Sequence, residues 1–109
     1  MPECIFCKIA SGEIPKEFTY ESKGVMAFPD IHPLRPVHLL VMPKKHARDF
    51  IDFDDLKTWE EMQTVIKKLI VDNKLDKNGY RLGINGGGAQ LIDHLHVHIV
   101  GPVKKTDKM

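Results

Sequence analysis

The run His94-Leu95-His96-Val97-His98-Ile99-Val100-Gly101 carries three of the six histidines of the chain, at alternate positions. Successive side chains of a β-strand point to opposite faces, and same-face neighbours lie roughly 6.5 to 7 Å apart. If residues 94–100 form a strand, the three rings share one face and the apolar residues between them point into a core. Imidazole titrates near neutral pH and serves as a nucleophile or a metal ligand, so this row indicates a chemical site.

The residues alone leave three uses for this histidine row. The rings could be solvent-facing or paired across strands. A His-x-His pair on a strand could supply two ligands of a catalytic zinc. A neutral imidazole could instead act as a nucleophile, with its neighbours orienting it and binding the charge of the substrate. Strict alternation with aliphatic residues favours the last two.

Composition sets the class of protein. The chain has 109 residues, 42% hydrophobic and 28% charged, which predicts one domain over residues 1–109. Its 16 basic and 15 acidic residues nearly balance, so neither a nucleic acid nor an anionic membrane is expected as a partner. No apolar run reaches the ~20 residues of a membrane span and no signal peptide is recognisable, which makes the cytoplasm the expected location. The lysine-containing tail, residues 103–109, is expected to be solvated.

The pattern along the chain predicts an α+β fold with a mostly antiparallel sheet, because short strands flank a single long helix. That helix is expected over residues 54–73, where apolar residues recur at helical spacing after an acidic start. The other predicted elements are a short helix over 4–11, strands over 18–20, 25–28, 37–42, 80–85 and 94–100, a turn at 77–79 and a glycine loop at 86–88.

The only cysteines, Cys4 and Cys7, form a Cys-x-x-Cys pair. In a reducing compartment this spacing points to metal or redox chemistry more than to a structural disulfide. Two sulfurs provide only half of a four-coordinate zinc site. The residues by themselves therefore leave a metal site, a redox pair and a reduced dithiol open.

The chain resembles the histidine-triad (HIT) family, whose motif alternates three histidines with apolar residues, as residues 94–100 do. The resemblance extends over nearly the whole chain, in order. Its further segments are Cys4-Ile5-Phe6-Cys7-Lys8-Ile9, Gly12-Glu13-Ile14-Pro15, Phe28 with Asp30-Ile31, Pro36 to Val41, Pro43-Lys44-Lys45-His46, Gly79-Tyr80-Arg81, Asn85 and Gln90. The branch that it resembles most is the Hint-like nucleoside phosphoramidases, in their zinc-carrying form.

The resemblance implies a five-stranded antiparallel sheet with one long and one short helix. It also implies a homodimer that extends the sheet, with residues 54–73 and 80–85 at the interface. The implied activity is hydrolysis or transfer of a purine nucleotide from a nucleoside 5′-phosphoramidate or related conjugate. A covalent nucleotidyl-histidine forms and water releases the monophosphate, with no metal required for the chemistry.

The resemblance also assigns roles to residues. His96 would be the nucleophile, with His98, His94 and His38 in the histidine network around it. Asn85 and Gln90 would join His98 at the phosphate, and Asp30 would accept hydrogen bonds from the ribose. The slot for the base would be formed by Phe6, Ile9, Ile14, Ile31 and Leu40. Without the resemblance these apolar residues read as core, and Asp30 and Asn85 as turn residues.

In the zinc-carrying members of the family, two histidines complete the site that the cysteine pair begins. By this resemblance Cys4, Cys7, His46 and His94 would hold a structural zinc that ties the N-terminal helix to the first histidine of the triad. A zinc-bound His94 could not also act as an acid or base, so the metal would brace His96 from behind.

Three features depart from the phosphoramidase pattern. Leu91 stands where the family often has a serine close to the leaving group. The loop over residues 85–90 is about two residues shorter than is typical, and the aromatic-proline tail is missing. Altered leaving-group selectivity is therefore expected. Two other functions stay open: a metalloenzyme with the triad as ligands, and a nucleotide-binding protein with little turnover.

Overall fold

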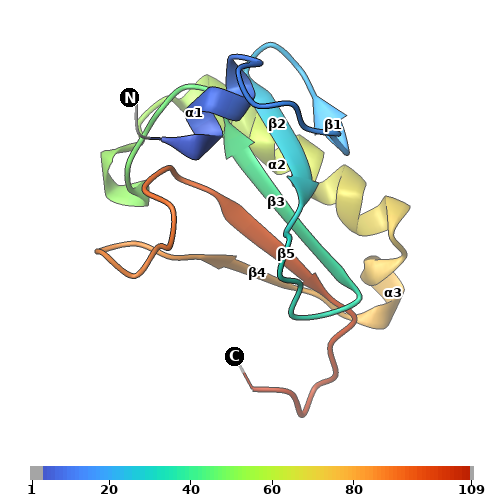
Figure 1. The fold of residues 1–109 in the computed structure, drawn as a ribbon. Helices are drawn as coiled ribbons and strands as arrows, with labels where there is room; N and C mark the ends of the chain where they lie inside the picture. The colour runs from blue at the N-terminus through green and yellow to red at the C-terminus, as the bar shows by residue number, and fades with distance from the viewer. Residues whose placement is uncertain (1–3, 109) are drawn as a thin grey trace.

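Five strands form one antiparallel sheet in the computed structural model, which describes residues 4–108 (Figure 1). The spatial order is β1-β2-β3-β5-β4. The strands are β1 (Tyr20–Glu21), β2 (Val25–Pro29), β3 (Val37–Pro43), β4 (Arg81–Ile84) and β5 (Val97–Gly101). The helices are α1 (Ile5–Ala10), α2 (Leu56–Asp72) and α3 (Leu75–Asn78), with a 3-10 turn at Phe50–Asp52. The predicted α+β fold with a five-stranded antiparallel sheet is confirmed.

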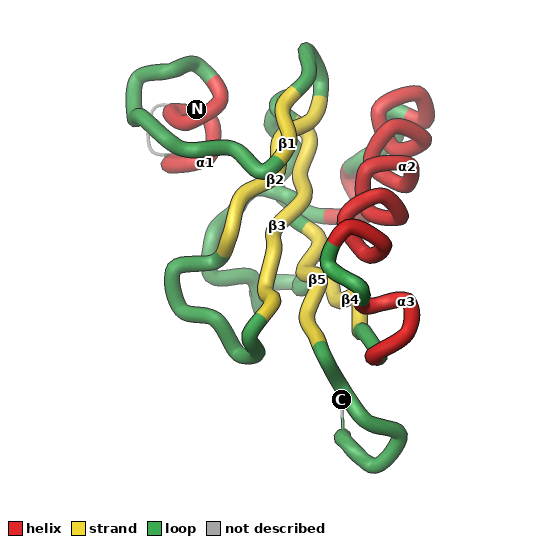
Figure 2. Tube along the Cα trace, turned by 90° about the vertical axis from the view of Figure 1, so that its right-hand side faces the viewer, coloured by secondary structure: helices red, strands yellow, loops and turns green. Residues whose placement is uncertain are grey.

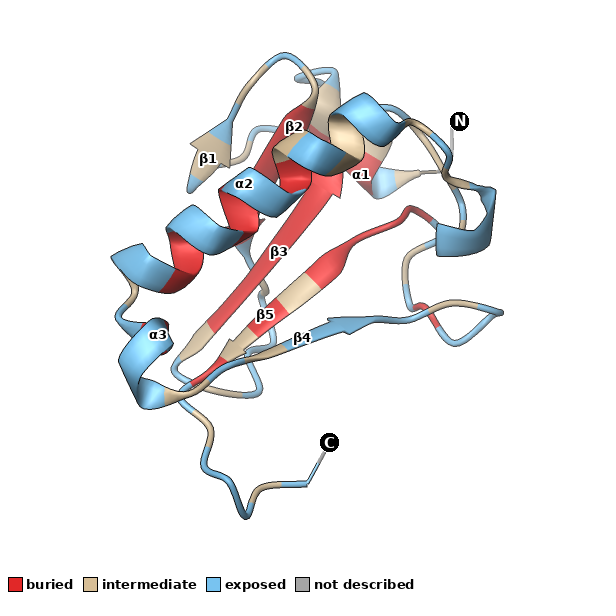
Figure 3. Ribbon diagram, turned by 180° about the vertical axis from the view of Figure 1, so that it is seen from behind, coloured by how far each residue is buried: buried red, intermediate tan, exposed pale blue. Residues whose placement is uncertain are grey.

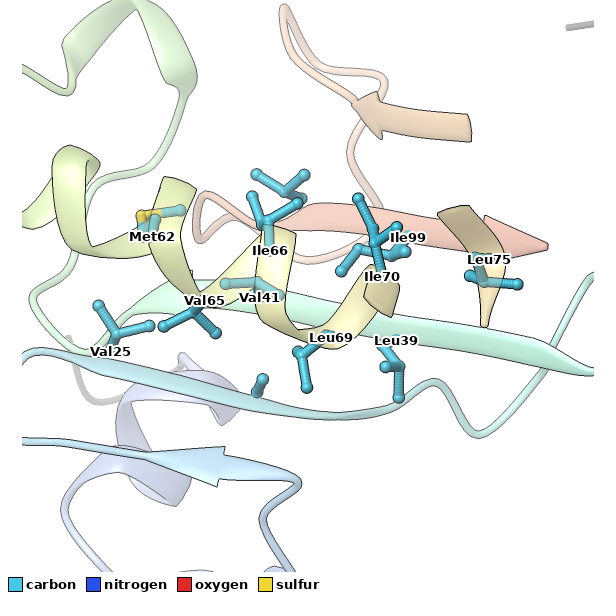
Figure 4. Packing of buried hydrophobic residues seen from close by; sticks show 12 residues of the cluster. Val25, Leu39, Val41, Met62, Val65, Ile66, Leu69, Ile70, Leu75 and Ile99 are labelled. Carbon is cyan, nitrogen blue, oxygen red and sulfur yellow. The ribbon is translucent and has the colours of Figure 1, made fainter. Parts of the chain in front are cut away.

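Helix α2 covers one face of the sheet and α1 lies on the other, so the molecule has three layers (Figure 2). The α2 helix begins after Asp55, whose carboxylate accepts a hydrogen bond from the Thr58 amide at 3.1 Å. Its apolar stripe packs on the sheet to form the main core (Figure 4). The helical side of this core consists of Met62, Val65, Ile66, Leu69 and Ile70, all buried.

The α1 side of the sheet carries a second, smaller core. Phe6 and Ile9 of α1 pack there against four buried residues of β2 and β3: Met26, Phe28, Leu40 and Met42. The α1 helix is only six residues long, and the Cys4 sulfur caps it by accepting the Cys7 amide at 3.3 Å. Packing, rather than helix length, therefore holds α1 against the sheet.

The strand β5 is shorter than predicted, because it begins at Val97 and not at His94. The register pairs Val41 of β3 with Val97. Continuing it two residues would place Leu95 opposite Pro43, which has no amide hydrogen to donate. The Leu95 amide donates instead to the Ala47 carbonyl at 2.7 Å, so the chain leaves the sheet there. The alternation survives nevertheless: Leu95, Val97 and Ile99 are all buried.

Two other predicted elements differ from the structure. Strand β1 starts at Tyr20 rather than at residue 18, and Phe18 instead packs beside Phe28 with the ring centroids 6.3 Å apart. The turn predicted at 77–79 lies partly within α3, a helix that includes residues 77 and 78 and was not predicted from the sequence. Lys74, at a φ of 61°, separates α3 from α2, and the buried Leu75 anchors α3 on the main core.

The tail after β5 is also docked, not fully solvated as predicted. The Val103 amide donates to the Gly79 carbonyl at 3.2 Å. Gly79 has a φ of 89°, and a Cβ there would lie 2.0 Å from the Val103 oxygen, so only glycine fits. Further along, the Arg81 guanidinium donates to the carbonyls of Asp107 and Lys108.

Strand β4 lies at one edge of the sheet, and three of its four residues are exposed (Figure 3). Leu82 and Ile84 are 44% and 37% exposed, and Tyr80 just before the strand is 43% exposed. The three apolar side chains lie beside α2, where they line a shallow cavity together with Trp59 and Ile66. Among residues 4–108, no helix combines the length and apolarity needed to cross a bilayer.

Candidate functional site

One face of the sheet, the face toward α1, brings together histidines of two strands and of the loop before β5. The register places His38 opposite Val100, and His98 opposite both Leu40 and Gly83. Because side chains alternate across a sheet, these positions share one face. His98 therefore faces the same side as His38, and the short loop before β5 adds His96.

His96 is held in one tautomer. Its Nδ1 lies 2.6 Å from the His94 carbonyl oxygen, which can only accept, so Nδ1 carries the hydrogen. The unprotonated Nε2 has no hydrogen-bond partner in residues 4–108. The ring is 6% exposed and packs edge-on against Phe6, with the centroids 5.3 Å apart. His96 is thus a fixed imidazole with a free lone pair.

A chain of hydrogen bonds fixes the tautomer of His98. The Leu34 amide donates to His38 Nδ1 at 3.0 Å, so that nitrogen bears no hydrogen. His38 must then carry its hydrogen on Nε2, which lies 2.8 Å from His98 Nδ1 and donates to it. A neutral His98 consequently has its hydrogen on Nε2. That atom is buried and finds no acceptor among residues 4–108, which leaves a hydrogen-bond donor available to a ligand.

The environment keeps His98 neutral. Burial is the main cause that lowers the pKa of His98 to about 4, and the nearby His96 and His38 act in the same direction. The neighbouring Asp30 carboxylate opposes this shift of the pKa but does not cancel it. At neutral pH the site therefore presents one imidazole lone pair and one imidazole N–H side by side, with the two ring centroids 5.0 Å apart.

A cavity of about 340 Å³ opens onto these two histidines. Most of its wall is apolar, and its polar residues are Lys16, Asp30, His32, Asn85, His96 and His98. Eight of the predicted site residues line it: Phe6, Ile9, Asp30, Ile31, Leu40, Asn85, His96 and His98. This combination of an apolar wall with a few convergent polar groups is typical of a small-ligand site.

Two predicted substrate contacts lie elsewhere. Ile14 is half-buried against the α1 core and is not part of the cavity lining. Gln90 is 8% exposed, and both ends of its amide are already bonded to backbone. Its oxygen accepts from the Gly88 amide at 2.9 Å, and its nitrogen donates to the Arg48 carbonyl at 3.1 Å. Gln90 in this arrangement positions the loop.

The Asp30 carboxylate takes part in two interactions. One oxygen accepts from the His32 amide at 2.8 Å, which is the turn interaction that the sequence left open. The other lies 3.4 Å from His38 Nε2. Asp30 therefore steadies the turn and the histidine chain, and it still lines the cavity.

The glycine loop is tied down by Asp49. The Gly87 amide donates to one Asp49 carboxylate oxygen at 2.8 Å. A Cβ on Gly86 would approach the other oxygen to 2.5 Å, so any larger residue there would force the Asp49 side chain to shift. Asn85, just before the loop, is exposed and makes no side-chain hydrogen bond with residues 4–108. Its amide is free to contact a ligand in the cavity.

A second cluster of polar side chains includes the first histidine of the row. It consists of Cys4, Cys7, His46 and His94, whose ligand atoms all lie within 4.8 Å of one another. His94 is completely buried, and its Nε2 donates to the Pro43 carbonyl at 2.7 Å. Its unprotonated Nδ1 therefore faces the sulfurs of Cys4 and Cys7, at 3.3 and 3.6 Å. The Cys7 sulfur lies 3.3 Å from His46 Nδ1. The four residues form a possible metal site.

The protonation of this cluster follows from its burial. Burial is the main cause that raises the pKa of the Cys7 thiol to about 11, and Cys4 adds to the shift. The pKa of His94 is lowered to about 4, again mainly by burial. His94 is thus ready to ligate as a neutral ring, whereas a metal must displace the Cys7 proton.

A second group of possible ligands consists of Asp30, His38 and His98. A metal on His38 would use its Nε2 lone pair. The Nδ1 atom of the same ring already accepts the Leu34 amide, so both nitrogens would have to be unprotonated at once. A neutral imidazole cannot meet that demand. We therefore assign this group to the hydrogen-bond chain and not to a metal.

The cavity also has wall residues that the sequence did not single out: Ile5, Lys16, Phe28, Pro29, His32, Ala89 and Ile92. Leu91, which the resemblance places close to the leaving group, lines it as well. Lys16 places its ammonium 4.8 Å from the centroid of the Phe28 ring. Leu91 is 90% exposed although it is apolar, and such exposure at the rim of a cavity is the signal of a contact residue.

Comparison with known proteins agrees with this geometry. Residues 3–109 match the family model described as "Scavenger mRNA decapping enzyme C-term binding". The structure is similar to that of a HIT family hydrolase from Legionella pneumophila Philadelphia 1, with a TM-score of 0.87, 41% identity and coverage of 95% of this chain and 96% of the other.

Two curated sequences show the same relationship. An uncharacterized HIT-like protein of Methanocaldococcus jannaschii is 41% identical over 99 residues, which are 89% of this chain and 77% of the relative. The adenosine 5′-monophosphoramidase of Candida albicans is 36% identical over 105 residues, which are 89% of this chain and 68% of the relative. The chain belongs to the histidine-triad (HIT) family.

Proposed function

We propose that this protein is a hydrolase that releases a nucleoside monophosphate from nucleoside 5′-phosphoramidates or related purine nucleotide conjugates. One observation carries the proposal: the free lone pair of His96 Nε2 lies beside the unpartnered N–H of His98 in one cavity. A nucleophile and a donor for the charged phosphate are thus set in place before substrate arrives. The phosphoramidase from Candida albicans, a relative at 36% identity, supports the substrate class.

The cavity suits a nucleotide in one orientation. Phe6, Ile9, Ile31 and Leu40 supply an apolar slot for the base. Asp30 accepts hydrogen bonds from the ribose hydroxyls, and Asn85 joins His98 at the phosphate. In the proposed complex Ile14 supports the slot from behind, and Gln90 holds the glycine loop in place.

The reaction proceeds in two displacements. The His96 Nε2 lone pair forms a bond to the α-phosphorus as the bond from phosphorus to the leaving amine breaks, and the amine departs with a proton from water. The His94 carbonyl holds the hydrogen on His96 Nδ1 and so stabilises the positive charge that develops on the ring. Water then attacks the phosphorus, breaks the bond to His96, and yields the monophosphate and a proton.

The second imidazole acts electrostatically. His98 Nε2–H donates to a phosphate oxygen, and His38 keeps it in the donor tautomer. Donors aimed at a phosphoryl group in a water-poor site stabilise the charge that builds up in the transition state. His98 does not have to give up its proton for this role.

A structural zinc fits the cluster of Cys4, Cys7, His46 and His94. In a tetrahedral site with Zn–S near 2.3 Å and Zn–N near 2.0 Å, neighbouring ligand atoms lie about 3.5 Å apart. Three of the four sulfur–nitrogen pairs in the cluster lie 3.3, 3.3 and 3.6 Å apart, which matches that spacing. Zinc there would fix the position of His94, whose carbonyl orients His96, and would leave the chemistry to the histidines.

A homodimer is proposed through β4 and α2. The outer edge of β4 is unpaired in residues 4–108, and Leu82 and Ile84 are exposed beside a cavity of about 550 Å³ against α2. An unpaired, apolar strand edge is a template for pairing with another chain. Sedimentation of the wild type and of Ile84→Lys tests this: a dimer that the variant turns into monomers is expected, and a monomeric wild type contradicts it.

A binding protein with little turnover is the second candidate function. The observation in its favour is Leu91, which is exposed at the rim of the cavity and offers no hydrogen bond to a leaving group. Such a protein would bind a nucleotide and release monophosphate slowly or not at all.

A substrate panel distinguishes the two functions. Purified protein is incubated with adenosine phosphoramidates, an aminoacyl adenylate and a dinucleoside polyphosphate, and AMP release is followed by chromatography. Turnover of the phosphoramidates that is lost in His96→Ala supports the hydrolase. Tight nucleotide binding by calorimetry without AMP release from any substrate supports the binding protein.

A further inference from the structure

We propose that a second cavity, on the far side of His98 from the base slot, binds an anionic group carried by the leaving half of the substrate. This inference rests on the proposed function and names its substrate class: conjugates whose leaving group bears a carboxylate or a phosphate. The cavity has a volume of about 540 Å³. It shares His98 and Asn85 with the nucleotide cavity, so both cavities border the two residues that the proposed function places at the phosphate.

The sheet register makes room for a leaving group. Gly83 of β4 lies opposite His98, and a Cβ built on Gly83 would meet nothing within 4 Å. Arg81 is the next residue of β4 on the same face, where it lies opposite Val100. Same-face positions are about 6.5 to 7 Å apart, so an anion at Arg81 would lie several bonds from the phosphorus.

The far end of this cavity is cationic. Arg35, Arg81 and Lys108 line it. Arg35 makes one long ion pair, 3.5 Å from the Asp107 carboxylate, and its side chain is 39% exposed. The Asp107 side chain also accepts the Lys104 amide at 2.7 Å within the tail. The Asp107 carboxylate thus already lies beside Arg35 at this end of the cavity. An anionic group of a ligand could make the same kind of contact with the arginines.

The competing explanation is that the arginines only anchor the tail. Arg81 does donate to the carbonyls of Lys108 and Asp107, and its loss would loosen residues 104–108. Arg35 has no such backbone contact with residues 4–108, so it is the better residue to change. A tail anchor affects stability or all substrates alike, whereas a binding site affects the choice between leaving groups.

The experiment measures kcat/KM for two adenosine 5′-phosphoramidates that differ in the charge of the leaving amine. One carries glutamate through its amino group, and the other carries the uncharged glutamate diamide. The wild type is expected to prefer the acidic substrate. Arg35→Gln should lower that preference by about three- to tenfold, because it removes one charge-assisted contact at a partly exposed site. Higher salt should reduce the preference of the wild type as well.

Two further variants sharpen the result. Lys23→Gln removes the same charge in the turn between β1 and β2, and it should keep the wild-type preference. Asp107→Asn removes the internal carboxylate but can still accept the Lys104 amide, and it should raise the preference for the acidic amine. A wild type without preference, or an Arg35→Gln variant with an unchanged ratio, overturns the proposal.

A third substrate separates the two sources of the anion. If a dinucleoside polyphosphate is cleaved faster than the glutamate conjugate and responds more strongly to Arg35→Gln, the anion is a phosphate. The opposite order identifies a carboxylate. Failure of the proposed function looks different: no substrate of either charge releases AMP. AMP release from both amines at equal rates leaves the hydrolase intact and removes only the anion site.

Discussion

His94 and His96 stand two residues apart and are both buried, yet the protein uses them in opposite ways. His94 uses both ring nitrogens within the fold, one on the Pro43 carbonyl and one toward the cysteine sulfurs. Within residues 4–108, His96 uses only Nδ1, on the His94 carbonyl, and its Nε2 has no partner in the cavity. In the proposed mechanism the same amino acid is a support at position 94 and a nucleophile at position 96, because the fold occupies different ring nitrogens.

The contrast also links the two sites. The carbonyl that sets the tautomer of His96 belongs to His94, whose ring lies in the Cys/His cluster. Phe6 packs edge-on against both rings, at 5.8 Å from His94 and 5.3 Å from His96. Disturbing the cluster should therefore weaken catalysis indirectly, whereas disturbing His96 should abolish it.

The largest effect is expected from His96→Ala. Removal of the proposed nucleophile should lower AMP release from adenosine 5′-phosphoramidate by about 10⁴-fold or more. Steady-state kinetics measures the loss, and thermal unfolding shows whether the variant is folded. A folded variant that retains a tenth of the wild-type rate would be incompatible with covalent catalysis at this residue.

Cys7→Ser tests the supporting role that we propose for His94 and the Cys/His cluster. The wild type should carry about one zinc per chain and the variant less than about 0.2, because four-coordinate sites need all their ligands. Zinc bound only by the folded state at about 1,000 times its Kd contributes about 4 kcal/mol, so Tm should fall clearly. Activity should fall less than in His96→Ala.

Metal analysis and calorimetry measure both consequences, and chelation of the wild type should reproduce the variant. The control is wild-type protein purified without added zinc. If it is folded and contains less than about 0.2 zinc per chain, the zinc proposal is wrong.

His98 provides a test by pH. Its folded pKa is about 4 and its ordinary value is 6.5, so between these values the unfolded chain binds a proton that the folded chain refuses. Stability should therefore fall as pH is lowered from 6.5 toward 4. The slope of the wild type should exceed that of His98→Asn by at most about 1.4 kcal/mol per pH unit. Urea unfolding across this range measures it, and equal slopes would show that His98 is not held neutral.

The smallest effect is expected from Leu91→Ser, at the rim of the cavity. The new hydroxyl can contact a leaving group that the exposed leucine cannot, so relative rates for different amines should change by a few fold. The comparison uses a pair of adenosine phosphoramidates with different amines. An unchanged order and ratio of rates would mean that residue 91 does not touch the leaving group.

Much of the fold could be predicted from local patterns. The helical spacing over residues 56–72 and the alternation at Leu95, Val97 and Ile99 each identify a buried face, and the structure confirms both. The start of β5 could not be predicted, because it depends on Pro43, a residue of another strand that is brought opposite by the register. Helix α3 was missed because four residues contain too little periodicity.

The site, like the fold, could be predicted only in part. The histidine motif brought His96 and His98 to attention, the family resemblance added Asp30, and the structure gathers all three in one cavity. The direction of each hydrogen bond was beyond the sequence, since the tautomer of His98 depends on the Leu34 amide through His38. The same limit applies to Gln90, whose amide is bonded to backbone 42 residues away as well as to its own loop.

The account depends most on the bond between His96 and phosphorus. Wild-type protein mixed with adenosine 5′-phosphoramidate, quenched in alkali within a turnover and digested, should yield a peptide containing His96 with one added adenylyl group by mass spectrometry. His96→Ala should yield none. AMP release by the wild type without an adduct, or with the adduct on His98 or another residue, would contradict the central claim.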